Sequence, residues 1–517
     1  MGRGFVLLVA MLLAIAGCAA PTEPDAAGVS EETVVFGLSS EPDTLNPVLG
    51  YSPDGGSLIF DGLLRRTPDL KLHPALAESV PDAVGTEITF TLRQGVTFHD
   101  GRPLTAEDVA YTYNQVLAPE NNSPIRGDYA AIEKVEASDE RTVVFHLKHP
   151  YAPVLQRATL GVIPAGSDLA ALGNAPVGTG PYTFTSWTKG DKIALTANEK
   201  YWNGAPAIRS LVLAYTSDDN ARATRMAAGE FTATELPPKA AARFKDQEGV
   251  TVHETPSADY RGIMFPMKHP VTGDRAIRKA LDLAVDREAM VSAILAGAGS
   301  PAFGPVVPGT DWHNPAVTGS ARPDTEAAGK LLDEAGWKAG PDGIRVKDGT
   351  AARFTLMYPA GDSLRKELAL AFASDAKRIG IDIQLAGLEW EAIDPRMDTD
   401  ALIMGFGTPY DPDHTNYELF HSAYAGQGYF NPGHYDNPEV DRLLETGRET
   451  ADQAAREKAY HEFQQVISDD APWVYLVYLK HVYVVRGSWT GLETGIEAHE
   501  HATAGLLGTV TDWKPAP

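Results

Sequence analysis

Cysteine is nearly absent from this chain of 517 residues, and basic side chains are few: 44 Lys and Arg stand against 69 Asp and Glu. A single Cys excludes an internal disulfide framework and a cysteine-rich metal site. The formal net charge of -25 argues against a sequence-independent nucleic-acid binder, which needs a basic surface. We therefore expect no nucleic-acid partner.

Long apolar runs are missing after the first few residues. Residues 1–17 (MGRGFVLLVAMLLAIAG) have a basic start and then an apolar run that is short for a membrane span and typical of a secretory signal. No later stretch reaches about 18 uninterrupted apolar residues. We predict a signal peptide at 1–17 and a body that lies outside the cytoplasm.

The one cysteine, Cys18, directly follows Ile15-Ala16-Gly17. This order resembles a bacterial lipobox, in which the cysteine is acylated and becomes the mature N-terminus. Residues 18–32 are small, polar and proline-bearing, which is typical of a flexible tether. We predict a lipid-anchored linker at 18–32 and a location at the cell membrane, on its extracytoplasmic side.

The common catalytic motifs are also missing. No GxSxG, HExxH or GxxxxGK[ST] pattern occurs, which disfavours a secreted hydrolase or a nucleotide-binding enzyme. We expect no enzyme activity and no cofactor. His499 and His501 would share one face of a strand and could form a metal-ligand pair, with an exposed pair that binds nothing as the alternative.

What is present is a mixture of strand and helix patterns in two blocks. The expected strands are 33–38, 88–92, 143–147, 183–185, 193–195, 354–358, 381–385 and 473–479. The expected helices are one within 51–80, one that begins at Thr105 with a capping sequence, and 277–291, 326–335, 364–379, 439–448 and 453–468. With no fixed repeat, the pattern indicates a multi-lobed α/β protein.

Five segments, in this order, resemble the family 5 extracytoplasmic solute-binding proteins of ABC importers, the peptide/nickel class. They are LRQGVTFHDG at 92–101 followed by TAEDV at 105–109, GTGPY at 178–182 followed by NEKYW at 198–202, RAIRKALDLAVDRE at 275–288, KLLDEAGW at 330–337 and DAPW at 470–473. Most of these residues have turn or core chemistry and are expected to hold the fold rather than touch a ligand.

The resemblance implies a two-lobed, type II periplasmic-binding-protein-like α/β fold with an extra subdomain inserted in lobe 1. The implied division assigns 33–59, 178–266 and 485–517 to the core of lobe 1, 60–177 to the insertion and 267–484 to lobe 2. Hinge crossings are expected near 265–268 and 480–484. The implied partners are an ABC permease and its ATPase, and the protein is expected to be a monomer.

The resemblance also points to ligand-binding residues in lobe 2. The stretch 402–414 (LIMGFGTPYDPDH) is expected to face the cleft, and in peptide-binding relatives the equivalents of Trp390 and Phe406 line the pocket. Ordinary packing is the alternative for both rings. Peptide binders carry an acid soon after the second aromatic, which fixes the ligand's ammonium group. This sequence departs from that pattern, since Thr408 and Tyr410 occupy the place and Asp411 comes later.

The order Gly-x-Pro-Tyr-Asp-Pro is instead similar to the nickel-binding branch, in which a histidine follows directly. Here the imidazole is His414, one residue late, and it is the candidate metal ligand. Arg126 and Tyr129 resemble an Arg–aromatic pair that clasps the carboxylates of a metal chelate, with Arg157 nearby in the sequence. A surface Arg126 paired with an acid is the alternative. Tyr51 completes the predicted ligand-binding set.

Together these observations predict a substrate-binding lipoprotein of an ABC transporter that captures a short peptide or peptide-like solute. A nickel chelate is the alternative ligand, and a secreted hydrolase is the disfavoured alternative of another class.

Overall fold

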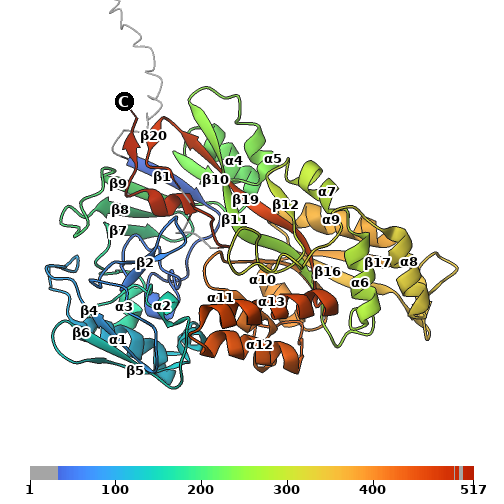
Figure 1. The fold of residues 1–517 in the computed structure, drawn as a ribbon. Coiled ribbons are helices and arrows are strands. Elements are labelled where there is room, and N and C mark those ends of the chain that lie inside the picture. The colour runs from blue at the N-terminus through green and yellow to red at the C-terminus, as the bar shows by residue number, and fades with distance from the viewer. Residues whose placement is uncertain (1–32, 494, 500–504, 517) are drawn as a thin grey trace, which may run out of the picture.

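A single sheet of eleven strands extends through the chain, as the computed structural model shows for residues 33–493, 495–499 and 505–516 (Figure 1). The order of its strands is β17-β16-β18-β11-β19-β10-β1-β9-β8-β7, and β12 (Gly299–Pro301) pairs with β19. One end of the sheet belongs to each of two lobes, and helices cover its faces. The predicted two-lobed α/β fold is confirmed.

Lobe 1 contains one end of the large sheet, where parallel and antiparallel pairings both occur. Its strands are β1 (Thr33–Leu38), β7 (Tyr182–Thr188), β8 (Lys192–Ala197), β9 (Ser210–Tyr215) and β10 (Ala233–Glu235). β1 lies between β9 and β10 and runs parallel to both, which explains why its β-branched and aromatic side chains are buried. The helices α4 (Asp219–Ala227) and α5 (Pro238–Ala242) follow β9 and β10.

A subdomain within lobe 1 carries a three-stranded sheet of its own, at the lower left of Figure 1. It contains β4 (Glu87–Thr91), β5 (Ile132–Ala137), β6 (Thr142–Leu147), α1 (Ala106–Leu117), α2 (Val154–Arg157) and α3 (Leu169–Leu172). The expected capping box of α1 is present, since Thr105 N donates to Asp108 Oδ2 at 2.7 Å.

The prediction of a helix within 51–80 is wrong. In its place the chain makes turns and a small hairpin of β2 (Leu64–Arg66) and β3 (Leu72–Pro74). Ser52, Gly55 and Gly56 have positive φ angles, so the backbone there cannot continue as a right-handed helix.

Lobe 2 has helices on both faces of its part of the sheet. Its strands are β16 (Arg353–Pro359), β17 (Asp382–Leu388) and β18 (Ala401–Phe406), which run parallel. Apolar residues of α6 (Arg275–Ala284), α8 (Thr325–Glu334) and α9 (Ser363–Arg378) pack on one face. Those of α10 (Trp390–Ile393), α11 (Asp413–Phe420), α12 (Pro438–Glu449) and α13 (Gln453–Asp470) pack on the other.

The helix expected at 277–291 is interrupted. α6 ends at Ala284, Val285 is extended, and a new turn starts at α7 (Arg287–Ala289) with the carboxylate of Asp286 as its cap. The break places the fully buried Arg287 inside the lobe, where its Nε donates to the carbonyl oxygens of Ala302 and Tyr475. Satisfying this buried guanidinium outweighs the helical periodicity.

Two long antiparallel strands, β11 (Val250–Met264) and β19 (Trp473–Arg486), run through both lobes. Their register shifts between Pro256 and Tyr260. The β11 residues from Tyr260 onward already pair with β18 of lobe 2, so this irregularity precedes the crossing expected near 265–268. The lobe boundaries themselves stay a prediction.

The tail after β19 makes a further connection that the sequence did not suggest. Glu497 N donates to Pro256 O at 2.9 Å, Ala258 N donates to Glu497 O at 2.7 Å, and His499 N donates to Gly407 O at 2.8 Å. The chain after residue 504 packs back into lobe 1 through Leu506, Leu507 and Trp513. The segment 495–499 therefore lies against both lobes.

No helix among the described residues is both long enough and apolar enough to cross a membrane. The predicted signal peptide at 1–17, the linker at 18–32 with Cys18, and His501 lie outside the described residues.

Candidate functional site

The carboxyl ends of the parallel strands of the two lobes face each other. α4 begins shortly after β9, and α9 begins shortly after β16. Asp219 at the start of α4 accepts hydrogen bonds from Ser363 at the start of α9, at 2.6 Å from Oγ and 3.3 Å from N. Ligands of open α/β sheets bind at such carboxyl ends, so the space between the lobes is the candidate site.

One side of this space is closed by contacts of α9. Besides Asp219 and Ser363, Lys239 of α5 forms an ion pair with Glu367 of α9. We call these four residues the α9 rim. Its ion pair is exposed and therefore contributes little stability.

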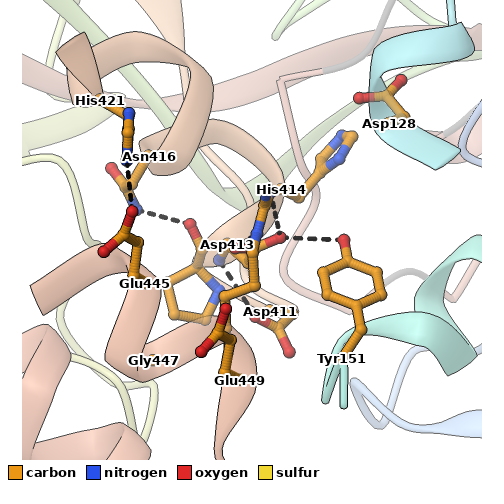
Figure 2. A network of polar contacts seen from close by, with 12 residues as sticks. Asp128, Tyr151, Asp411, Asp413, His414, Asn416, His421, Glu445, Gly447 and Glu449 are labelled. Carbon is orange, nitrogen blue, oxygen red and sulfur yellow. Dashed lines mark hydrogen bonds and ion pairs between the residues drawn. The ribbon is translucent and has the colours of Figure 1, made fainter. Parts of the chain in front are cut away.

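The opposite side is closed by the loop that leads from β18 into α11. Tyr151 Oη donates to Asp413 Oδ2 at 3.1 Å, and Figure 2 shows this tyrosine pointing from the inserted subdomain at the carboxylate. His414 lies between two lobe 1 side chains, with Nδ1 2.9 Å from Arg157 and Nε2 3.0 Å from Asp54 Oδ1. Together with Arg66, whose guanidinium lies 4.5 Å from the centre of the Tyr410 ring, these residues form the α11 rim.

Between the rims, buried polar side chains gather where β11, β19 and the tail cross. We call Asp259, Arg261, His481, Glu497 and His499 the floor cluster. His481 lies between two carboxylates, with Nδ1 2.6 Å from Glu497 Oε2 and Nε2 3.3 Å from Asp259 Oδ2. His499 Nδ1 lies 2.9 Å from Asp259 Oδ1, and the guanidinium of Arg261 contacts the same carboxylate.

The two histidines of this cluster differ in charge. Burial alone would lower the pKa of His481, but the carboxylates of Glu235, Asp259 and Glu497 outweigh it and raise that pKa well above its ordinary value. Burial lowers the pKa of His499, so this ring is neutral near pH 7. Two carboxylates of the cluster, Asp259 and Glu497, therefore face two cations, Arg261 and protonated His481, while burial raises the pKa of the neighbouring Glu235 carboxyl.

Several buried polar atoms of the floor cluster and of residues on the neighbouring elements lack a hydrogen-bond partner within the described part of the chain. They are the Nε atoms of Arg261 and Arg365, Oε1 of Glu497, and the hydroxyl groups of Tyr260 and Tyr475. Buried polar groups are nearly always paired, and leaving one unpaired costs about 1–3 kcal/mol. The unpaired atoms of Arg261 and Glu497 belong to the floor cluster itself, so a polar ligand could pair with them there.

The structure brings five predicted residues to this space. Phe406 ends β18, with its ring centre 6.1 Å from those of Trp473 and His499. Thr408 is buried and accepts a hydrogen bond from Tyr410 N at 3.2 Å, and Tyr410 and His414 belong to the α11 rim. Asp411 lies in the same loop, where both its oxygens accept from Arg456 at 2.9 Å, so it holds α13 in place.

Trp390 and Tyr51 make their ring contacts with residues outside the floor cluster. Trp390 begins α10, is 37% exposed, and makes an edge-to-face contact with Tyr429 at 5.6 Å. Tyr51 is buried against Phe60, and burial raises the pKa of its hydroxyl to about 12. Their part in ligand binding stays a prediction.

The expected Arg126–Tyr129 pair is not assembled. Arg126 is exposed and its Nε donates to Leu117 O at 2.9 Å, while Tyr129 is buried against Tyr113. The arginine that does reach the cleft is Arg157, which is 4% exposed and contacts His414. Arg126 and Tyr129 as ligand contacts stay predictions.

The described residues do not form a cluster of metal ligands. Within residues 33–493, 495–499 and 505–516, no group of three or more His, Cys, Asp and Glu side chains could hold a metal ion. His414 is flanked by Arg157 and Asp54 rather than by further imidazoles.

Of the floor cluster, the motif analysis singled out His499, as one of a possible pair of metal ligands, and missed the other four residues. A signal for two of them was present, because Asp259 and Arg261 stand two residues apart in a strand that is otherwise apolar from Ala258 to Met264. A charged pair on one face of a buried strand is costly and points to a functional or structural network. Glu497 gave no such signal, since its place depends on the path of the tail.

Known proteins resemble this chain over nearly its whole length. The sequence profile of the bacterial extracellular solute-binding proteins, family 5, matches residues 71–428. Protein XP55 of Streptomyces lividans is 46% identical over 520 residues, which cover 98% of this chain and 95% of that protein.

Two solved structures are similar in fold. NikZ from Campylobacter jejuni in complex with Ni(L-His) has a TM-score of 0.86 and 28% identity, covering 94% of this chain and 99% of that one. AppA from Bacillus subtilis in complex with a nonapeptide has a TM-score of 0.82 and 27% identity, with the same two coverages. The family match, the long alignment and the shared two-lobed fold agree with one another, so this chain belongs to the family 5 bacterial extracellular solute-binding proteins, the non-enzymatic substrate-binding components of ABC importers.

Proposed function

We propose that this protein captures a short peptide or a peptide-like solute and delivers it to the permease of an ABC importer. The observation that carries the proposal is the pair of buried, unpartnered Nε atoms of Arg261 and Arg365, two arginines that lie near each other between the two rims. Guanidinium N–H groups form strong hydrogen bonds with carboxylates, and every peptide with a free C-terminus carries a carboxylate.

The surroundings of the two arginines suit a varied solute. The ring of Phe406 offers apolar area without demanding one side-chain shape, and Thr408, Tyr410 and His414 close the α11 rim beside it. A ligand that contacts both lobes favours the closed arrangement by its differential affinity for it. The permease and its ATPase would then recognise that closed arrangement.

The proposal includes the cellular location of the protein. A signal peptide at 1–17 would direct export, and acylation of Cys18 would anchor the protein, as a monomer, at the extracytoplasmic side of the membrane. The flexible linker at 18–32 would let the folded part move away from the membrane surface.

A nickel chelate is the second candidate. The similarity to NikZ, whose structure contains Ni(L-His), favours it, as does the presence of His414 at the α11 rim and of His499 in the floor cluster. The carboxylates of a chelate would bind the same two arginines.

The test uses the mature protein, freed of co-purified molecules by unfolding and refolding. We expect native mass spectrometry with a randomised tripeptide pool to show bound peptides, and small-angle scattering to show compaction. Arg365→Lys keeps the charge beside Asp362 but loses Nε, and we expect it to weaken binding roughly tenfold. Arg353→Lys, on the exposed surface of lobe 2, is the control.

The alternatives give different results. A bound mass that appears with Ni(II) and histidine, and not with peptides, would favour the chelate. Binding of neither probe would refute the proposal.

A further inference from the structure

The inserted subdomain has a cavity of its own. The volume of this cavity is about 640 Å³, and its described lining residues all lie between Leu117 and Lys148. Sites for small molecules commonly have volumes of about 300–1,000 Å³. None of the described lining residues belongs to the floor cluster or to either rim. The cavity is therefore a candidate for a second ligand site.

The charged side chains of the cavity wall are mainly cationic. Arg126 and Lys148 line the cavity, and Glu133 is the one acid among its described lining residues. Arg126 Nε donates to Leu117 O at 2.9 Å, and Lys148 Nζ donates to Ala130 O at 2.7 Å. These bonds hold both cations at the wall. The two Nη atoms of Arg126 have no hydrogen-bond partner among the described residues, so they are available to a ligand.

Apolar side chains complete the wall beside the two cations. Leu117, Pro119 and Ile132 are among them. Guanidinium and ammonium groups bind carboxylates and phosphates, and apolar walls favour the burial of hydrocarbon. The wall therefore suits a small organic anion, which has a carboxylate or phosphate group on an apolar body.

The cavity also shares a structural element with the contact between the lobes. Arg126 and Gly127 both line the cavity, and both belong to the 3-10 helix η3 (Arg126–Tyr129). A Cβ on Gly127 would lie 4.0 Å from Tyr424 Oη, in η6 (Ser422–Tyr424) of lobe 2. The helix η3 therefore lies against both the cavity and lobe 2.

The next residue of η3 reaches the α11 rim. Asp128 Oδ1 lies 3.7 Å from the guanidinium of Arg157. The same guanidinium lies 2.9 Å from His414 Nδ1. A ligand that fixes η3 would thus also fix side chains that hold the two lobes together at this rim.

We propose that the cavity binds a small organic anion and that the bound anion stabilises the closed arrangement of the lobes. An anion between Arg126 and Lys148 would hold η3 where Gly127 and Asp128 meet their partners. By linkage, closure would raise the affinity for the anion by the same factor. This role goes beyond the capture of a solute, because the cavity contains none of the residues proposed to bind that solute.

The test uses the mature protein and two fluorinated anions, 4-fluorophenyl phosphate and 4-fluorobenzoate. The neutral counterpart is 4-fluorobenzamide, and fluorine resonance spectra measure the binding of all three. We expect the anions to bind at least tenfold more tightly than the amide, because only the anions form charge-assisted hydrogen bonds with the cationic wall.

Two substitutions in the wall should act in opposite directions. Lys148→Met removes a cation and should weaken anion binding roughly three- to tenfold, whereas Glu133→Gln removes the acid and should strengthen it roughly two- to fivefold. Lys134→Met is the matched control, because Lys134 is in the same strand as Glu133 but pairs with Glu136 and is not among the lining residues. It should change neither affinity. Loss of folding could weaken binding but could not strengthen it.

Small-angle scattering measures the coupling to closure. We expect saturating 4-fluorophenyl phosphate, without any other solute, to reduce the radius of gyration, and 4-fluorobenzamide to leave it unchanged. Lys148→Met should require a three- to tenfold higher concentration of the anion for the same reduction.

The contrary outcomes are distinct. Equal binding of the anions and the amide, or an anion affinity that neither Lys148→Met nor Glu133→Gln changes, would overturn the site. Anion binding with an unchanged radius of gyration would overturn its coupling to closure. Each of these outcomes leaves the proposed function standing, because the tripeptide pool tests that function separately.

Discussion

Among single side chains, the acids of the Pro-Tyr-Asp-Pro-Asp-His loop differ in role from what their place beside the cleft suggests. Asp411 is held by Arg456, and Asp413 is held by Arg448 through two bonds at 2.9 and 3.0 Å. Breaking such a buried pair costs about 3–5 kcal/mol, because one charge is left uncompensated. These two acids therefore fix the loop. His414, the next residue of the loop, instead contacts Arg157 and Asp54 of lobe 1.

A single carboxyl group, that of Glu418, is expected to make closure sensitive to pH. Glu418 of α11 is buried, and burial together with the carboxylate of Asp128 raises its pKa well above the ordinary value, although Arg157 acts in the opposite direction. Asp413 is a further charged neighbour that raises it. Asp128 belongs to the inserted subdomain, so a protonated Glu418 bonds across the lobes.

A carboxyl group whose pKa is raised in the closed arrangement stabilises that arrangement when it is protonated. This stabilisation is complete at low pH and is lost as the pH rises through the raised pKa. We expect the closed fraction of the unliganded protein to be larger at pH 5 than at pH 8, measured by energy transfer between fluorophores on the two lobes. The pKa values of Asp54 and Asp413 lie below the ordinary range, so these acids do not titrate in this window. Their burial opposes that lowering, and nearby cations prevail.

Glu418→Gln keeps a donor for Asp128 and should abolish the pH dependence between pH 5 and pH 8. Glu445→Gln, on the exposed side of α12, should retain it. A wild-type closed fraction that is the same at both pH values would contradict the expectation.

Among the secondary-structure elements, the end of β18 is where three segments meet. Gly407 has a φ of +131°, and a Cβ at this position would lie 2.0 Å from Ala258 O of β11. Its carbonyl oxygen accepts from His499 N of the tail. The glycine lets strand, loop and tail approach closely, which any side chain would prevent.

Gly407→Ala should destabilise the protein by roughly 1–3 kcal/mol or more, since strain and a backbone clash add together. Urea unfolding measures the loss, and hydrogen exchange should show faster exchange of the amide of His499. Gly428→Ala is the matched control, because Gly428 also has a positive φ but nothing lies within 4 Å of its added Cβ. Equal effects of the two substitutions would show that the close approach at Gly407 has no energetic weight.

For the molecule as a whole, closure depends on two rims on either side of the crossing strands. The α9 rim consists of a hydrogen bond and an exposed ion pair, whereas the α11 rim contains the buried Arg157 and Asp413. Exposed pairs contribute about 0–1 kcal/mol each. The two rims therefore differ in strength, and the α9 rim is the one that opens at lower cost.

Ser363→Ala combined with Glu367→Ala removes the α9 rim contacts and leaves the pair of Asp219 and Arg222 intact. We expect a larger radius of gyration without ligand, and an affinity for the tripeptide pool that falls roughly two- to tenfold, because part of the binding energy must restore closure. Small-angle scattering and a binding titration measure both.

Glu288→Ala combined with Ser292→Ala changes the same residue types within lobe 2 and should alter neither quantity. An unchanged radius and affinity in the α9 rim variant would show that this rim does not hold the lobes together.

Much of the fold follows from local order in the chain. The capping box at Thr105, the alternation in β4 and β6, and the helical spacing in α8, α9, α12 and α13 depend on neighbours a few residues away, and all were anticipated. The five motifs, by their order along the chain, predicted the family and its two-lobed fold. The candidate loop 402–414 was found in the same way.

The grouping of side chains between the lobes was not foreseeable residue by residue. Arg157 and His414 are 257 positions apart, and Glu497 meets β11 only because the tail turns back across the crossing strands. Such contacts depend on the arrangement of whole elements, and no local propensity encodes them. Periodicity and motif order therefore account for the elements and the family, whereas burial of charges between the lobes, set by packing over long separations, defines which side chains face the solute.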